Sequence, residues 1–235
     1  MNGKVAENKQ FVLEVIACSV EDAVNAEEGG ADRLEVISGF EFGGYTPPLD
    51  LVRAIQDAVR RPLRVMLREE ACYGLTEVIS IERLFGVANE LNKMKVDGVV
   101  LGFLHAGQVD VRLTQKVLAC APNLKATFHH AFEDTDDKSA AIKAIKDNGQ
   151  VDRILAHGGM GTSAERIDRL AGYAASAAPE IQILAGGRVD VQMIREIRLR
   201  TQIREFHIGS AARIGGTVNV GLVRRLAEAV RGLYV

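Results

Sequence analysis

Two glutamates and an arginine stand within strongly apolar stretches, where a charged side chain needs a reason to be present. Glu14 lies in the run VLEVIA, Glu35 lies in RLEVI, and Arg68 ends the run LRVMLR. An unpaired carboxylate in such surroundings costs several kcal/mol, or its pKa rises and it takes up a proton. The three side chains could form a structural ion network. Alternatively, they handle a polar substrate, with a glutamate as general acid or base and the arginine as a clamp.

Histidines add groups that exchange protons near neutral pH. His129 and His130 end the run LKATFHH, and His207 lies inside EFHIGS. Each ring has the alternative of a buried, hydrogen-bonded position without a role in chemistry. With Glu133, the first two form an HHxxE array that could hold a divalent metal if the loop turned all three inward. His105, in LHAGQVD, is expected in an exposed loop.

Three glycine-bearing segments follow apolar runs: HGGMGTSAE from His157, AGGRV from Ala185 and GSAAR from Gly209. Glycine permits tight turns between a strand and a helix, and it also lets backbone amides approach an anion closely. Both interpretations stay open, with Arg213 as a further source of positive charge. The phosphate-binding interpretation predicts as ligands Gly158, Gly159, Gly186, Gly187, Arg188, Gly209 and Ser210.

These residues belong to a regular succession of short β-rich runs. The runs begin 22 to 34 residues apart, the length that a strand, a helix and two short loops require. The segments between them carry helix signals. Ser19 can cap a helix that a glycine pair ends, and Thr162 and Glu165 have capping-box spacing. The eight runs begin at Phe11, Arg33, Leu63, Asp97, Leu124, Asp152, Ile181 and Arg204.

Apolar strands that alternate with amphipathic helices need helices over both faces of an open sheet or around a closed one. Eight near-equal repeats favour closure. The prediction is an α/β fold, a single-domain (β/α)8 TIM barrel over residues 10–235, after a flexible N-terminal end of residues 1–9. The strand ends of such a barrel share one mouth. We therefore expect these side chains to meet there: Glu14, Glu35, Arg68, His129 and His207.

Composition limits the partners. Lys and Arg total 29 against 31 Asp and Glu, a net charge of −2, so no basic surface predicts nucleic acid or membrane binding. Small molecules and further copies of the chain remain, and we expect a homo-oligomer. Three cysteines without CxxC spacing argue against a disulfide framework and a structural zinc site. With a polar N-terminus and no long apolar run, this predicts a soluble cytoplasmic protein.

As an ordered set, the motifs resemble those of the CutC family over nearly the whole chain. The resemblance implies a barrel with a role in cytoplasmic copper homeostasis, with copper as a bound ion, and leaves open whether the chain is an enzyme. It marks Glu14, Glu35, Arg68 and His129 as polar mouth residues and His207 as the histidine of the eighth strand. The motifs are LEV at 13–15, GGADRLEV at 29–36, GGYTP at 43–47, VMLR at 65–68, DGVVLG at 97–102, TFHHAF at 127–132, DRIL at 152–155 and EFHIGSAAR at 205–213.

The sequence departs from the family where copper(I) would find sulfur. Family members often carry cysteines after the first two glutamates, whereas this chain has Ile16, Ala17 and Ile37 there. Copper(I) prefers thiolate and thioether ligands. Cys72, in CYG, is the remaining candidate metal ligand, and Cys120 is expected in a helix core. Two hypotheses follow: a copper-binding homeostasis protein, or an enzyme that performs acid–base chemistry on a small anionic, for instance phosphorylated, substrate without a further cofactor.

Overall fold

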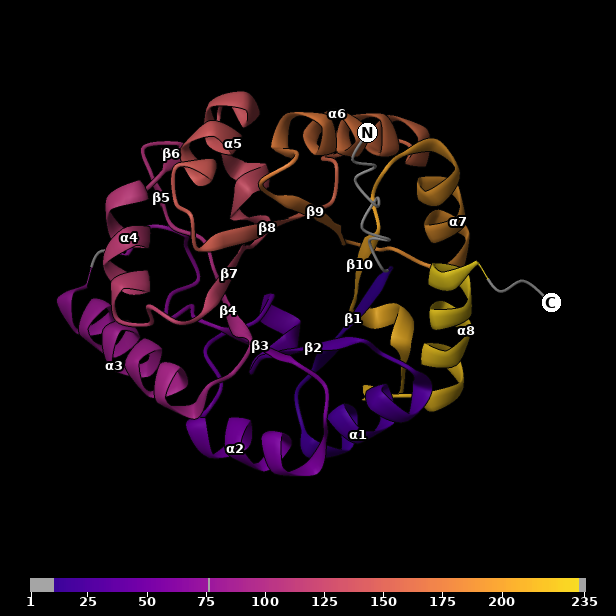
Figure 1. The fold of residues 1–235 in the computed structure, drawn as a ribbon, viewed down its shortest axis with the longest axis horizontal. Helices are drawn as coiled ribbons and strands as arrows, with labels where there is room; N and C mark the ends of the chain where they lie inside the picture. The colour runs from indigo at the N-terminus through magenta and orange to yellow at the C-terminus, as the bar shows by residue number, and fades with distance from the viewer. Residues whose placement is uncertain (1–10, 76, 233–235) are drawn as a thin grey trace, which may run out of the picture.

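Eight parallel strands form a closed barrel in the computed structural model, which describes residues 11–75 and 77–232. Each strand pairs with its neighbours in chain order, and the last pairs with the first (Figure 1). Each of the eight expected runs coincides with one of these strands to within one residue at its start, so the predicted (β/α)8 barrel is confirmed. The predicted N-terminal end of residues 1–9 lies outside the described residues. The barrel strands are β1 (Val12–Ala17), β2 (Arg33–Val36), β3 (Leu63–Met66), β4 (Gly98–Leu101), β7 (Lys125–Phe128), β8 (Val151–Ala156), β9 (Gln182–Ala185) and β10 (Glu205–Ile208).

Helices between the strands form the outer ring in Figure 1. Ser19 accepts a hydrogen bond from the Asp22 amide at the start of the first helix, and Thr162 and Glu165 form the expected capping box on the sixth. No helix among the described residues is both long and apolar enough to cross a bilayer. The helices are α1 (Val20–Gly29), α2 (Leu49–Ala58), α3 (Val78–Met94), α4 (Val111–Ala119), α5 (Lys138–Lys146), α6 (Ser163–Ala177), α7 (Val191–Arg200) and α8 (Val220–Arg231).

Short elements follow the C-terminal ends of several strands, and these ends form the mouth of the barrel. Three 3-10 turns follow β2, β7 and β10, namely η1 (Phe40–Phe42), η2 (His130–Asp134) and η3 (Ser210–Ala212). Two hairpins, β5 (Leu104–His105) with β6 (Gln108–Val109) and β11 (Arg213–Ile214) with β12 (Thr217–Val218), follow β4 and η3. His105 is exposed, as expected, although it belongs to a hairpin.

Side chains on the strands alternate between two environments, because successive residues of a strand point to opposite faces. Leu13, Val15 and Leu34 are completely buried and belong to the apolar core between the strands and the helices. Glu14 and Arg33 take the alternate positions inside the barrel. The register pairs Glu14 with Arg33 on one side and with His207 on the other. The pairing of the strands therefore brings charged residues from three strands together.

Candidate active site

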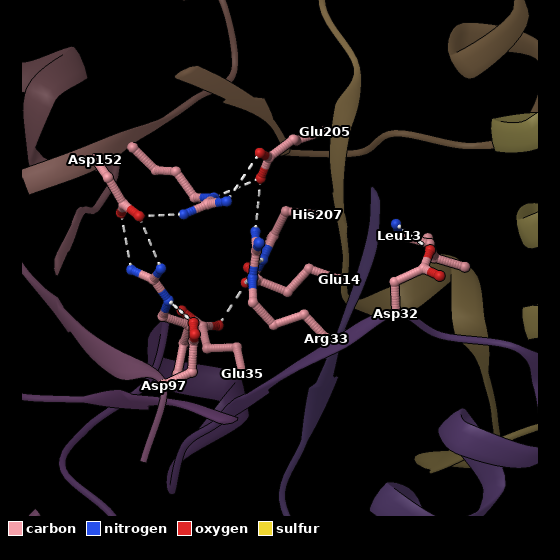
Figure 2. Close-up of polar contacts among 11 residues, drawn as sticks. Leu13, Glu14, Asp32, Arg33, Glu35, Asp97, Asp152, Glu205 and His207 are labelled. Atoms are coloured by element: carbon pink, nitrogen blue, oxygen red, sulfur yellow. Dashed lines mark hydrogen bonds and ion pairs between the residues drawn. The ribbon is translucent and has the colours of Figure 1, made fainter. Parts of the chain in front are cut away.

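A continuous network of ion pairs fills the interior of the barrel (Figure 2). Arg64 on β3 donates two hydrogen bonds of 3.0 Å to Asp152 on β8 and one of 2.6 Å to Asp97. Because β3 and β8 are not neighbours in the ring, the contact with Asp152 crosses the interior. Arg153 donates to Asp152 and also to both oxygens of Glu205, at 2.5 and 3.0 Å.

Arg33 extends this network toward the mouth. Its guanidinium donates to Glu205 at 2.9 Å and to Glu14. His207 Nδ1 lies 2.8 Å from Glu14 Oε1, and His207 Nε2 lies 3.6 Å from Glu35 Oε2. The other oxygen of Glu35, Oε1, is buried and has no hydrogen-bond partner within the described part of the chain. The network thus ends at a carboxyl group with one unused polar atom.

The two glutamates differ in charge although both are buried. Burial favours the neutral form of Glu14, but the charges of Arg33 and the hydrogen bond with His207 outweigh it, so the pKa of Glu14 falls well below 4.5. Burial dominates at Glu35, where the charge of Glu14 adds to it and His207 offsets only part, and its pKa rises to about 7. Burial opposes a charge on His207, yet Glu35 and Glu14 raise the pKa of this histidine above 6.5. Near pH 7 the site holds an ionised Glu14, a Glu35 that is partly protonated, and a His207 whose cationic form the two glutamates favour.

A pocket of about 310 Å³ lies at this end of the network, and we call it the mouth pocket. Glu35 and His207 line this pocket, and each stands one residue before the last residue of its strand, β2 or β10. Large apolar side chains form one side of the pocket, and this apolar surrounding strengthens the interaction between the two titratable groups. These apolar residues are Ile16, Ile37, Phe40, Met66, Leu155 and Val189.

The loops after β9 and β10 line the other side of the mouth pocket, as a phosphate site in such a barrel would require. Gly186, Gly187, Arg188, Gly209 and Ser210 all belong to its lining. The amide of Gly186 donates to the Ala156 carbonyl at 2.9 Å. Gly187 has a φ of +70°, and a Cβ there would lie 2.5 Å from the Cβ of His157. Glycine is therefore required at this position by the turn itself, and the Gly186 amide is already engaged by the neighbouring strand.

The loop after β8 differs, because a carboxylate from the protein already occupies its amides. Glu133 accepts hydrogen bonds from the amides of His157 and Gly158 at 2.8 and 2.7 Å. The Gly159 amide donates to His157 Nδ1 at 3.0 Å. Gly158 does not line the mouth pocket, and Gly159 lines a neighbouring cavity. A Cβ on Gly158 would lie 2.4 Å from the carbonyl oxygen of Arg166, which accounts for that glycine by close packing.

Arg68 and His129 lie away from the lining of the mouth pocket. The Arg68 guanidinium lies 5.2 Å from the ring centres of both Tyr45 and Tyr73, and all three of its nitrogens donate to backbone carbonyls. His129 is completely buried, and its Nδ1 accepts from the Ala131 amide at the start of η2. Burial, aided by the charges of His130 and Arg68, lowers the pKa of His129 well below 6.5. The structure thus unites Glu14, Glu35 and His207, and separates the other two from them.

His130 reaches the mouth pocket in place of its neighbour. Its ring stacks on that of His129 with 5.2 Å between the centres. Burial and the charge of Arg68 lower the pKa of His130 to about 4. The imidazole that borders the pocket on this side is therefore neutral.

The sequence model of the CutC family matches residues 11–212 of this chain. The chain belongs to the CutC family. A CutC family protein of Xylella fastidiosa is 33% identical over 196 residues, which cover 83% of this chain and 73% of that protein. The human protein named copper homeostasis protein cutC homolog is 31% identical over 207 residues, or 88% of this chain and 76% of that one.

Solved structures share the fold. The crystal structure of CutC from Streptococcus agalactiae superposes with a TM-score of 0.77 at 21% identity, covering 86% of this chain and 99% of that chain. A thiamine phosphate pyrophosphorylase from Pyrococcus furiosus has a TM-score of 0.63 at 17% identity, covering 96% and 98% of the two chains. At these identities the likeness establishes the barrel and nothing about the chemistry of this CutC family member.

The name of the human relative raises the question whether this CutC family member carries copper ligands. The Cys72 thiol is exposed and donates to the Gly74 carbonyl at 2.9 Å, and burial raises the pKa of the Cys18 thiol. Glu133 is bound to the loop after β8, so the HHxxE array is not assembled. Within residues 11–75 and 77–232, no group of three His, Cys, Asp or Glu side chains could hold a metal ion. These donors do not form the sulfur-rich set that copper(I) prefers.

Three arginines of the network are absent from the sequence-based predictions: Arg33, Arg64 and Arg153. Their signal in the sequence is strand parity, because residues two apart on a strand share a face. Arg33 stands two residues before Glu35, and Arg64 two residues before Met66. Glu35 lines the mouth pocket, as does Met66. Strand alternation therefore predicts that Arg33 and Arg64 point into the barrel on the same side of their strands as Glu35 and Met66.

Proposed function

We propose that this CutC family member is an acid–base enzyme that acts on a small organic anion in the mouth pocket. Glu35 is the group that gives and takes the proton. His207 lies beside one oxygen of Glu35, and a hydrogen bond with Glu14 positions the His207 ring. The reaction class is proton transfer at a carbon or oxygen atom next to the polar group that the mouth pocket binds.

One observation carries this proposal: Glu35 Oε1 is buried, has no hydrogen-bond partner among the described residues and belongs to a side chain that lines the mouth pocket. A buried polar atom without a partner costs roughly 1–3 kcal/mol, so it calls for an explanation. A substrate atom in the mouth pocket supplies the missing partner.

The pKa of Glu35 supports the same role. A general acid or base works best when its pKa is close to the working pH, and burial raises the pKa of Glu35 to about 7. His207 Nε2 lies 3.6 Å from Glu35 Oε2, and in its cationic form, which the two glutamates favour, it stabilises the carboxylate after the proton has left. Glu14 remains ionised throughout, because Arg33 and His207 hold its charge, and fixes the imidazole through Nδ1.

The lining of the mouth pocket suggests the class of substrate. Gly187, Gly209 and Ser210 offer a backbone turn and a hydroxyl suited to a phosphate or carboxylate, with Arg188 at the edge. The apolar side chains between this rim and Glu35 suit a short carbon body with few polar groups. The substrate is therefore a small phosphorylated or carboxylated compound whose reacting atom reaches Glu35.

Deuterium exchange tests this proposal without knowledge of the product. Small phosphorylated and carboxylated compounds are first ranked by thermal shift and then incubated with the protein in D2O, where proton NMR detects solvent deuterium that enters the compound. We expect stabilisation by at least one compound, with exchange or turnover. Glu35→Gln keeps the shape of the side chain but loses the titrating proton, so we expect it to bind the compound and to slow exchange by about 10²–10⁴-fold.

Glu41→Gln is the matched control, because Glu41 is an exposed glutamate on η1. It should exchange deuterium at the wild-type rate. Two outcomes would contradict the proposal: no compound at millimolar concentration stabilises the protein, or Glu35→Gln exchanges as fast as the wild type.

Copper binding is the second candidate, and the name of the human relative favours it. In this case copper is the cargo, and Cys72 is its candidate ligand. Anaerobic equilibrium dialysis with copper(I) distinguishes the two functions. Stoichiometric binding that Cys72→Ser abolishes would support copper binding, whereas the donors described above lead us to expect none.

We further propose a cytoplasmic location, since Cys18, Cys72 and Cys120 are all free thiols, as a reducing compartment would keep them. The expected homo-oligomer stays a prediction, and sedimentation velocity of the purified protein would test it.

A further inference from the structure

A second cavity, of about 250 Å³, adjoins the mouth pocket. His157, Gly187 and Arg188 line both, so the two spaces share a wall. Met160 and Arg166 line only the second one, which we call the arginine pocket.

The arginine pocket carries an excess of positive charge. Arg166 donates through Nε to the His157 carbonyl at 2.8 Å and through Nη2 to the Gly187 carbonyl, so neutral acceptors fix its guanidinium. Arg169 is held in the same way by the carbonyls of Gly158 and Met160. The carboxylate that acts on Arg166 is that of Glu133, which two backbone amides already engage. Burial and the charge of Arg188 lower the pKa of Arg166, and the charge of Glu133 offsets only part of this effect. Glu165, whose carboxylate also binds Thr162, is the charged neighbour of Arg169.

Arg188 adds a second, independent observation. Its guanidinium has no hydrogen bond or ion pair among the described residues, although it lines both cavities. Its backbone has a φ of +57°, in the left-handed region. That conformation costs a residue other than glycine roughly 1–2 kcal/mol, and such costs cluster at ligand sites. The sequence AGGRV thus places an arginine where a third glycine would be less strained.

We infer that the arginine pocket is a second anion subsite and that the natural ligand carries two anionic groups. One group lies against the loops after β9 and β10, and the other lies between Arg188 and Arg166. The ligand class is a small bisphosphate or a phosphorylated carboxylic acid, with its carbon body in the mouth pocket. This inference rests on the proposed function, whose ligand it defines more narrowly.

Isothermal titration with simple phosphonates tests the inference. The probes are alkyl monophosphonates and α,ω-alkylene bisphosphonates with two to five methylene groups. Met160→Glu places a carboxylate at the arginine pocket alone, and Met160→Gln is its neutral control. Because Met160 is 87% exposed, neither change should disturb folding, and thermal unfolding verifies this. Arg188→Gly removes the guanidinium in a residue that accepts the local φ, and Arg224→Ala, on the exposed side of α8, is its control for charge.

In the wild type, Met160→Gln and Arg224→Ala, we expect at least one bisphosphonate to bind tenfold or more tightly than its monophosphonate. In Met160→Glu and Arg188→Gly that advantage should fall below threefold. If monophosphonates bind and no bisphosphonate binds more tightly, or the advantage survives both changes, the second subsite is refuted while the first anion site stands. If neither class binds, the proposed function fails as well.

Discussion

Replacing Glu35 with glutamine tests the electrostatics of the candidate site without any substrate. Glu35 has a pKa of about 7 in the folded protein, against its usual 4.5 in the unfolded chain. The difference of roughly 2.5 pKa units corresponds to about 3 kcal/mol. Between these two values the folded protein holds a proton that the unfolded chain has released. The free energy of unfolding therefore falls as the pH rises through this interval, and the full cost is present above the folded pKa.

His207, beside Glu35, makes the free energy of unfolding depend on pH in the same direction. His207 has a raised pKa, so its contribution is complete below 6.5 and is lost as the pH rises through the folded pKa. Glu35→Gln abolishes the first contribution and reduces the second, because the charge of Glu35 helps to raise the pKa of His207. Near pH 6 we expect a stability slope that is less steep than that of the wild type by up to about 1.4 kcal/mol per pH unit. At pH 8 we expect the variant to be more stable by about 1–3 kcal/mol, because the wild type then holds a buried carboxylate and the variant holds a neutral amide.

Urea unfolding at closely spaced pH values from 5.5 to 8.5 measures both quantities. Glu41→Gln, at an exposed carboxylate near the mouth, should reproduce the wild-type curve. If Glu35→Gln follows the wild-type curve over the whole range, or is the less stable protein at pH 8, Glu35 does not carry a raised pKa and the acid–base proposal loses its main support.

Three further predictions concern residues around this pair. Glu14→Gln leaves Arg33 with Glu205 as its remaining buried partner and removes the carboxylate from His207, and it should lower the free energy of unfolding by about 3 kcal/mol in urea at pH 7; a loss below about 1 kcal/mol would mean that the Glu14–Arg33 ion pair is solvated. His129→Ala removes a completely buried ring and should lower the free energy of unfolding by about 3 kcal/mol. The folded variant should exchange deuterium into the bound compound at the wild-type rate, and abolished exchange would mean that His129 takes part in the reaction. Thr162→Ala breaks the capping box of α6 and should cost about 1 kcal/mol by thermal unfolding, and an unchanged midpoint would contradict this.

Local signals in the sequence are enough to predict the barrel. Eight apolar runs at near-equal intervals correspond to the eight strands, and the caps at Ser19 and Thr162 mark two of the helix starts. These features depend only on residues that are close in the sequence, so they can be recognised without knowledge of the fold. The inward position of Glu14 and Glu35 also follows from strand alternation.

The partners of these glutamates could not be predicted in the same way, because they depend on register and on contacts across the barrel. Arg64 meets Asp152 from a strand three places away in the ring. Arg68 stands beyond the end of β3, where the chain has left the ladder, and its guanidinium turns to the carbonyls and tyrosines of nearby loops. His129 also follows the end of its strand and caps η2. Position at a strand end identifies the mouth but does not determine which way a side chain turns.

The arginines inside the barrel join segments that are far apart in the chain. Arg33 and Arg64 belong to the first half of the sequence, whereas Glu205 and Asp152 belong to the second. A fragment that ended after β4 would keep Glu14 and Asp97 but lose Glu205 and Asp152, and the complementary fragment would keep these two carboxylates with Arg153 but without Arg33 and Arg64. Neither fragment could close its own interior without a large energetic cost. We therefore expect the chain to fold as one cooperative unit, and the duplication or exchange of half-barrels to require matching changes in both halves.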